Sequence, residues 1–82
     1  MHPPVFSRRI TLPQNVRYFQ KTGSGSQLAR TGQGLSEGSV VSIGDPEAVV
    51  FDHRDQVAVP LEIYGQIFYM LVTEIGLPEL TN

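Results

Sequence analysis

The segment from Pro60 to Ile75 constrains the fold of this chain most strongly, because it is predominantly apolar and has clear boundaries. Proline suits the first position of a helix, and Gly76 suits the left-handed residue that ends one. Polar residues recur at i, i+4, i+7 and i+11, and the alternation typical of a strand fails after Gln66. The pattern therefore predicts a C-terminal helix over the whole segment, although Gly65 within it costs roughly 1 kcal/mol relative to alanine.

A helix over residues 60–75 would be about 24 Å long and apolar on more than half of its circumference. One small sheet can cover only one side of such a helix. Either the helix is sandwiched within the core, or part of it faces a partner. In the second interpretation the partner-facing side chains are Tyr64, Phe68 and Tyr69.

The rest of the chain is typical of short strands and turns. Residues 1–12 alternate apolar and polar side chains after two prolines, which predicts an edge strand or an extended arm able to join a partner's sheet. Residues 39–59 predict a β-meander of three short strands, with turns at 44–47 and 52–55. Residues 15–21 permit a short helix or a strand, and their β-branched and aromatic content favours the strand.

Glycine and serine dominate residues 22–39, with five glycines and four serines in this stretch. Such a composition predicts a long flexible loop that orders on contact with a partner. Within it, Gly23-Ser24-Gly25-Ser26 has a backbone able to cradle a phosphate, but it lacks the Gly-Lys-Ser/Thr ending of a phosphate-binding loop. A flexible loop is therefore the favoured interpretation of these four residues.

Together these patterns predict a single α+β domain over residues 1–82. Its architecture is a small, mainly antiparallel sheet or partial barrel, formed by a meander, with one C-terminal helix. A domain of 82 residues buries a smaller share of its surface than a large domain does, and this one has no cysteine to form a disulfide. We therefore expect it to oligomerise or to dock on a protein partner.

Charge is divided unevenly along the chain. Residues 1–36 carry five basic residues and no acid, whereas residues 37–82 carry one arginine and eight acids, so the two parts hold +5 and −7. Such asymmetry is typical of nucleic-acid contact or of head-to-tail assembly. Alternatively, the two parts fold together and neutralise each other.

Basic and aromatic residues interleave in the N-terminal part. This pattern suits either phosphate contact with base stacking or an acidic protein surface. The candidate partner-binding or nucleic-acid-binding residues are Arg8, Arg9, Arg17, Tyr18, Lys21 and Arg30.

Catalysis, metals and cofactors are not expected. The chain has no cysteine and only two histidines, His2 beside two prolines and His53 in a predicted turn. The cluster Asp52-His53-Arg54-Asp55 contains metal-ligand chemistry, but without an EF-hand spacing it is better explained as a hairpin turn. We expect no enzymatic activity, no bound metal and no cofactor.

The expected location is the cytoplasm or a virion. The residues Met1-His2-Pro3-Pro4 show no apolar signal region, which predicts a protein that is not secreted. The longest apolar run, Ile67 to Val72, is far shorter than the roughly 20 residues that span a bilayer. No membrane partner is therefore expected.

Two fragments resemble the swapped-hairpin DNA-binding barrel of AbrB-type transition-state regulators and related antitoxins. Residues 9–17 resemble the strand and short helix that open that fold, and residues 34–43 resemble its second strand entry. The resemblance covers nineteen residues. It implies an obligate dimer that inserts basic residues into a DNA groove, with Arg9 and Arg17 at the matching positions.

Two functions follow as hypotheses. The first is a non-enzymatic interaction or assembly protein that docks on a larger protein complex or self-assembles, such as a phage or virion accessory protein or an inhibitor. The alternative is a dimeric DNA-binding regulator or antitoxin. The small size, the charge division and the very apolar C-terminal segment favour the first.

Overall fold

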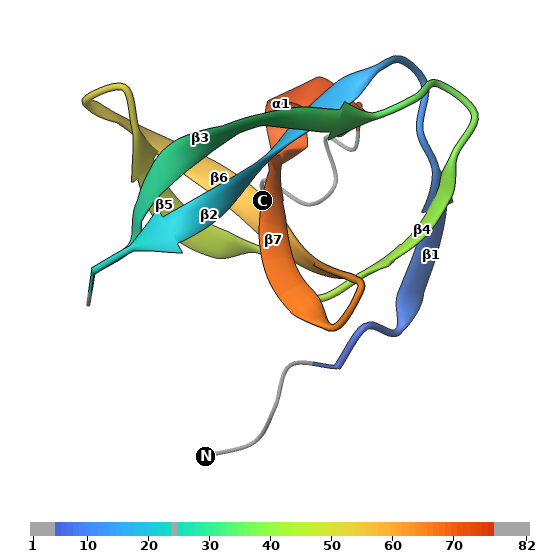
Figure 1. Ribbon diagram of the computed structural model, residues 1–82, viewed down its shortest axis with the longest axis horizontal. Helices are drawn as coiled ribbons and strands as arrows, with labels where there is room; N and C mark the ends of the chain where they lie inside the picture. The colour runs from blue at the N-terminus through green and yellow to red at the C-terminus, as the bar shows by residue number, and fades with distance from the viewer. Residues whose placement is uncertain (1–4, 24, 77–82) are drawn as a thin grey trace.

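The computed structural model describes residues 5–23 and 25–76, which form a single sheet of strands and one short helix (Figure 1). The elements are β1 (Arg8–Thr11), β2 (Val16–Thr22), β3 (Gln27–Leu35), β4 (Val40–Ile43), β5 (Glu47–Phe51), β6 (Arg54–Ile63), β7 (Gln66–Leu71) and α1 (Val72–Ile75). The strand order is β1-β4-β6-β5-β3-β2-β7, and β6 also pairs with β7. The sheet thus bends back on itself as a partial ring, and it is antiparallel apart from one β3–β5 pairing. This confirms the predicted small, mainly antiparallel sheet with one C-terminal helix.

Two tight hairpins connect the central strands. Asp52 and His53 join β5 to β6, and Tyr64 and Gly65 join β6 to β7. All four residues have positive φ, between 50° and 80°, as two-residue type I′ turns require. The hairpin turn predicted within residues 52–55 is therefore confirmed.

The helix predicted over residues 60–75 is wrong. The segment folds as the end of β6, a turn and β7, and the helix is confined to Val72–Ile75 before Gly76, which has a φ of 69°. The reason is that β7 is buried on both faces: Phe68 and Met70 join one apolar cluster, whereas their neighbours join another. A strand covered on both faces loses the period-2 alternation that distinguishes it from a helix.

The long flexible loop predicted over residues 22–39 is also wrong. Half of it is β3, which pairs with β2 from Gln27 to Leu35. The strand form of residues 15–21, which the sequence favoured, is confirmed by β2. Glycine is needed at Gly34 because a Cβ there would lie 2.6 Å from the carbonyl oxygen of Val16. Here glycine reflects close approach of two backbones rather than flexibility. Ser24, within the candidate phosphate-binding motif, lies outside the described residues.

The apolar core has two parts, on opposite faces of β2, β6 and β7. Five strands, β6, β5, β3, β2 and β7, form the ring, which the β6–β7 pairing closes. The ring cluster draws side chains from each of them and consists of Phe19, Leu28, Val49, Phe51, Ala58, Tyr69 and Leu71. The side cluster is covered by the β1–β4 pair and α1 and consists of Leu12, Val16, Tyr18, Ile43, Val59, Leu61, Phe68, Met70, Val72 and Ile75. Adjacent residues of β2, β6 and β7 therefore serve different clusters.

The N-terminal strand lies at the edge of the sheet. β1 pairs only with β4, which confirms the predicted edge strand for these residues, while residues 1–4 of the predicted arm lie outside the described part. Leu12 anchors the strand, since it is buried and its backbone bonds both Ser39 and Gly38 at 2.9 Å. The three strands predicted over 39–59 form. They are not a simple meander, because β4 and β5 each pair with β6 and not with each other.

Candidate functional site

Two of the predicted basic residues form ion pairs with acids from the other part of the chain. Lys21 Nζ lies 2.6 Å from Glu47 Oε1, and Arg17 Nη2 lies 2.9 Å from Glu74 Oε2. Arg17 Nε also donates to the same carboxylate at 3.1 Å. Folding thus brings oppositely charged parts of the sequence together, which supports the interpretation that they neutralise each other.

A first hollow, the arginine groove, lies over β2 and β3 and has a volume of about 740 Å³. Its charged side chains are Arg17, Arg30 and Glu74. The guanidinium carbons of Arg17 and Arg30 each lie 5.3 Å from the centre of the Phe51 ring, at cation–π distance. Two predicted binding residues therefore meet at one end of the ring cluster.

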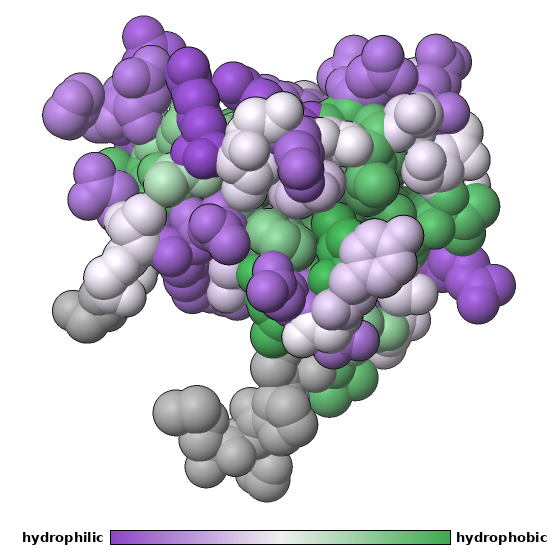
Figure 2. Space-filling model, in the orientation of Figure 1, coloured by the Kyte–Doolittle hydropathy of each residue, from purple (hydrophilic) through white to green (hydrophobic). Residues whose placement is uncertain are grey.

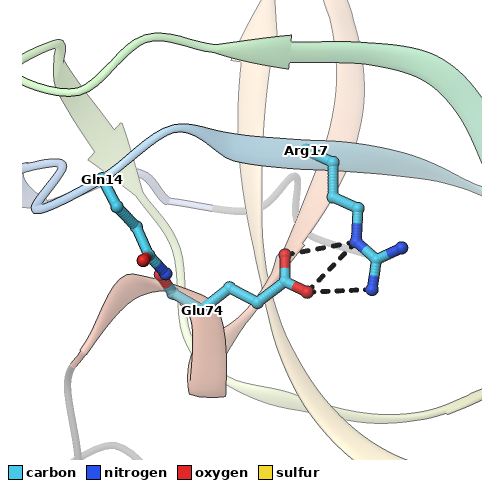
Figure 3. A network of polar contacts seen from close by, with 3 residues as sticks. All are labelled: Gln14, Arg17 and Glu74. Atoms are coloured by element: carbon cyan, nitrogen blue, oxygen red, sulfur yellow. Dashed lines mark hydrogen bonds and ion pairs between the residues drawn. The ribbon is translucent and has the colours of Figure 1, made fainter.

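Most polar side chains of the arginine groove already have partners within the molecule. Gln14 Nε2 donates to the carbonyl oxygen of Glu74 at 2.8 Å, next to the ion pair with Arg17 (Figure 3). Tyr18 Oη donates to Gln33 Oε1 at 2.7 Å. These contacts hold α1 against β2 and β2 against β3, so we interpret this groove mainly as a structural tie.

Lys21 occupies a different position, near the end of β2 and two residues after Phe19 of the ring cluster. Its hydrogen bond to Glu47 raises the pKa of the ammonium group above its ordinary value of 10.5, opposed in part by desolvation. The Nζ atom also lies 4.8 Å from the centre of the Tyr69 ring. The charge of Lys21 is therefore used within the fold.

A second hollow, the β4–β6 wedge, opens where two strands separate. β4 and β6 pair at Ile43 and Leu61, and the Gly44 N–H donates to the Pro60 carbonyl oxygen at 2.9 Å. Toward Val40 and Tyr64 the strands diverge and border an open hollow of about 480 Å³. The lining residues are Phe6, Leu35, Val40, Val41, Ser42, Leu61, Glu62, Ile63 and Tyr64.

The exposed large hydrophobic residues of the described chain gather around the wedge. Val40 and Tyr64 line it, and Ile67 is the cross-strand neighbour of Glu62. The Val5 carbonyl oxygen lies 3.2 Å from the position a Cβ would take at Gly44, where the wedge closes. Figure 2 shows this face, with hydrophobic residues between β7 and β4 and hydrophilic residues over β3 and β5. The exposed fractions are 70% for Val5, 59% for Val40 and 39% for Ile67, and Tyr64 is fully exposed.

Tyr64 is the most unusual residue of the wedge. It has a φ of 50°, a left-handed conformation that costs a residue with a Cβ roughly 1–2 kcal/mol. Asparagine, aspartate or glycine normally occupies such a turn position. Tyr64 thus combines a strained backbone conformation with a fully exposed aromatic ring.

The predicted partner-facing residues thus separate into two groups. Tyr64 is exposed, as the prediction requires. Phe68 and Tyr69 are only 9% exposed and belong to the side cluster and the ring cluster, so assigning them to a partner surface was wrong. The error has the same cause as the helix: both faces of β7 are covered.

The predicted basic residues do not form one patch. Arg8 and Arg9 lie on the edge strand β1, whereas Arg17, Lys21 and Arg30 lie on β2 and β3. Tyr18 is buried in the side cluster, 4.7 Å from Phe68 between ring centres, and it also lines the arginine groove, so its role in binding stays a prediction.

The reasoning from sequence missed Val40, which lines the wedge, and Ile67, which is paired with its lining residue Glu62. An apolar residue within a strand does not reveal on which face it lies until the pairing is known. Only the divergence of β4 from β6 leaves this part of both strands uncovered.

Comparison with known proteins identifies no relative of this chain. No protein-family model matches the chain, and neither a curated protein nor a solved structure shows significant similarity to it. Within the described residues, no group of three or more acidic or histidine side chains is placed to hold a metal ion. The helix of the described chain is too short to cross a membrane.

Proposed function

We propose that this protein is a small, non-enzymatic interaction protein that assembles with other protein through the β4–β6 wedge. The observation that carries the proposal is that Val40 and Tyr64, two exposed large hydrophobic residues of the described chain, line this hollow. Val5 and Ile67, which are also exposed, neighbour its lining residues Phe6 and Glu62. Contiguous apolar surface on a small domain is typical of a protein-binding site. The charge division adds little to it, since two of the cations are paired within the fold.

Tyr64 supports the proposal as an anchor residue. Tyrosine is enriched among the residues that contribute most to protein–protein binding, because its large ring loses little conformational entropy. Its position at the tip of the β6–β7 hairpin allows it to enter a partner surface without disturbing the core.

Backbone groups at the wedge support it as well. From Val40 to Ser42, the edge of β4 that faces β6 has no ladder pairing with another described strand. The same holds for the β4-facing edge of β6 after Leu61. Unpaired strand edges beside apolar pockets are typical sites for addition of a partner strand. The wedge therefore combines hydrogen-bonding capacity with apolar surface.

The Tyr64→Asn substitution tests the proposal. Asparagine accepts positive φ, so the type I′ turn should persist and the free energy of unfolding should stay equal or rise. Partner affinity should fall by about tenfold or more, as for loss of an aromatic anchor. Proteins that the wild type captures would be purified singly, and their dissociation constants measured by calorimetry against both forms.

His53→Asn is the matched control, because His53 is also exposed and also has positive φ in a two-residue turn. It should leave partner affinity unchanged. Equal affinities for wild type and Tyr64→Asn would contradict the proposal. Binding to DNA that falls steeply with salt and ignores Tyr64→Asn would favour the DNA-binding alternative.

A further inference from the structure

We infer that the partner seated on the β4–β6 wedge is a second copy of this chain, in a two-fold symmetric interface. This inference rests on the proposed function and names its partner. A two-fold interface uses the same patch on both subunits, so the patch must be complementary to itself. The wedge meets this condition in shape and in charge.

Shape complementarity comes from a protrusion beside a hollow. Tyr64 projects fully exposed from the tip of the β6–β7 hairpin and lines one side of the wedge. Val40 and Phe6, on the facing side, offer the apolar surface that a tyrosine ring requires. A two-fold axis through the wedge places each Tyr64 over the apolar side of the other copy.

Charge complementarity comes from Arg9 and Glu62. Arg9 is the cross-strand neighbour of Ser42 on β4. Continuing the β4–β6 register from Ile43 opposite Leu61 places Glu62 in the same cross-strand row, beyond Ser42. The row therefore carries a cation at one side of the wedge and an anion at the other.

Neither of these charges is neutralised within the described residues. Arg9 and Glu62 are both exposed, and neither joins the ion pairs that the described chain forms. A two-fold axis parallel to the strands reverses the row, so that Arg9 of each copy faces Glu62 of the other. Two equivalent ion pairs would then flank the exchanged tyrosines and define the register of the dimer.

The arginine groove is a weaker site for a second copy. Its Glu74 carboxylate is already bonded to Arg17, and its amide side chains are bonded within the fold. It also lacks the exposed large hydrophobic residues of the wedge. Nothing in it is complementary to itself in the way that the wedge is.

Sedimentation velocity of the purified chain over a concentration series tests the inference. The wild type should show a monomer–dimer equilibrium, and Tyr64→Asn should weaken it by about tenfold or more, whereas His53→Asn should not. Arg9→Glu and Glu62→Arg should each weaken the dimer, because like charges then meet across the axis. The double variant Arg9→Glu/Glu62→Arg should restore it, because each ion pair is rebuilt in reverse.

Three results would overturn the inference: a wild type that stays monomeric throughout, a dimer that Tyr64→Asn leaves intact, or a double variant no better than the single ones. Circular dichroism of each variant confirms that the fold persists, since all the substituted side chains are exposed. A monomeric wild type that still binds a different protein through Tyr64 would overturn the second copy while leaving the proposed function in place.

Discussion

The immediate surroundings of single residues in this protein indicate why each residue type is present. Gly34 passes so close to the β2 backbone that a side chain would collide with it. Tyr64 accepts a strained turn conformation, yet its side chain is fully exposed among the described residues. The first residue therefore serves folding, whereas the second is the anchor residue of our proposal.

Lys21 gives a residue-scale prediction with a defined pH dependence. Its pKa is raised in the folded state by the hydrogen bond to Glu47, so the ion pair stabilises the fold below the ordinary pKa of 10.5. That stabilisation is lost as the pH rises through the raised pKa, where the folded chain loses the proton. Lys21→Met should therefore cost about 0.2–1 kcal/mol near neutral pH, because the pair is partly exposed, and less above 10.5.

Urea denaturation of the wild type and of Lys21→Met, near neutral pH and above pH 10.5, measures the difference in the free energy of unfolding. Glu47→Gln and the double variant complete a thermodynamic cycle that isolates the pair from the cation–π contact with Tyr69. A difference that does not change with pH would show that Lys21 stabilises the fold through packing alone.

Among the elements, β7 shows how burial on both faces changes the sequence pattern. Five of its six residues are apolar, and the last four are buried alternately in the two clusters. The same proportion of apolar residues is typical of a buried helix, and the hairpin at Tyr64 and Gly65 distinguishes the two structures.

Substitutions on successive residues of β7 test this arrangement. Met70→Ala and Leu71→Ala should each lower the free energy of unfolding by about 2–5 kcal/mol, because each leaves a cavity in a different cluster. Thr73→Ala, at an exposed position of α1, should change it by less than about 0.5 kcal/mol. Chemical denaturation provides the values, and a β7 that tolerates either core substitution would contradict burial on both faces.

At the scale of the whole molecule, β2, β6 and β7 contribute to both the ring cluster and the side cluster. Neither cluster can lose these strands without exposing the other. The domain should therefore unfold as one cooperative unit, as is usual for chains of this size.

Two tyrosines allow the clusters to be followed separately. Tyr18 reports on the side cluster and Tyr69 on the ring cluster. Their NMR signals should disappear at the same urea concentration, both in the wild type and in Leu28→Ala, which weakens only the ring cluster directly. Loss of the Tyr69 signal before the Tyr18 signal would show that the clusters unfold independently.

Local patterns predicted much of the fold but less of the candidate site. The alternation before Leu12 indicates β1, the β-branched and aromatic residues after Asn15 indicate β2, and the polar cluster at Asp52 indicates a hairpin turn. Of the predicted partner-facing residues, only Tyr64 stays exposed on the wedge. The remainder of the wedge depends on where β4 leaves β6, which no local pattern records.

Local sequence patterns were enough to indicate the class of the domain, the hairpin turn at Asp52 and His53 and the short strands before Pro60, because these depend on backbone preferences over a few residues. Tertiary contacts decided that residues 60–71 form two strands and that half of the glycine-rich stretch is β3. They also decided that Phe68 is buried while Tyr64 is exposed. The physical reason is that an apolar side chain favours burial without specifying a partner. Only closure of the ring supplies a second covered face for β7 and leaves the β4–β6 wedge open.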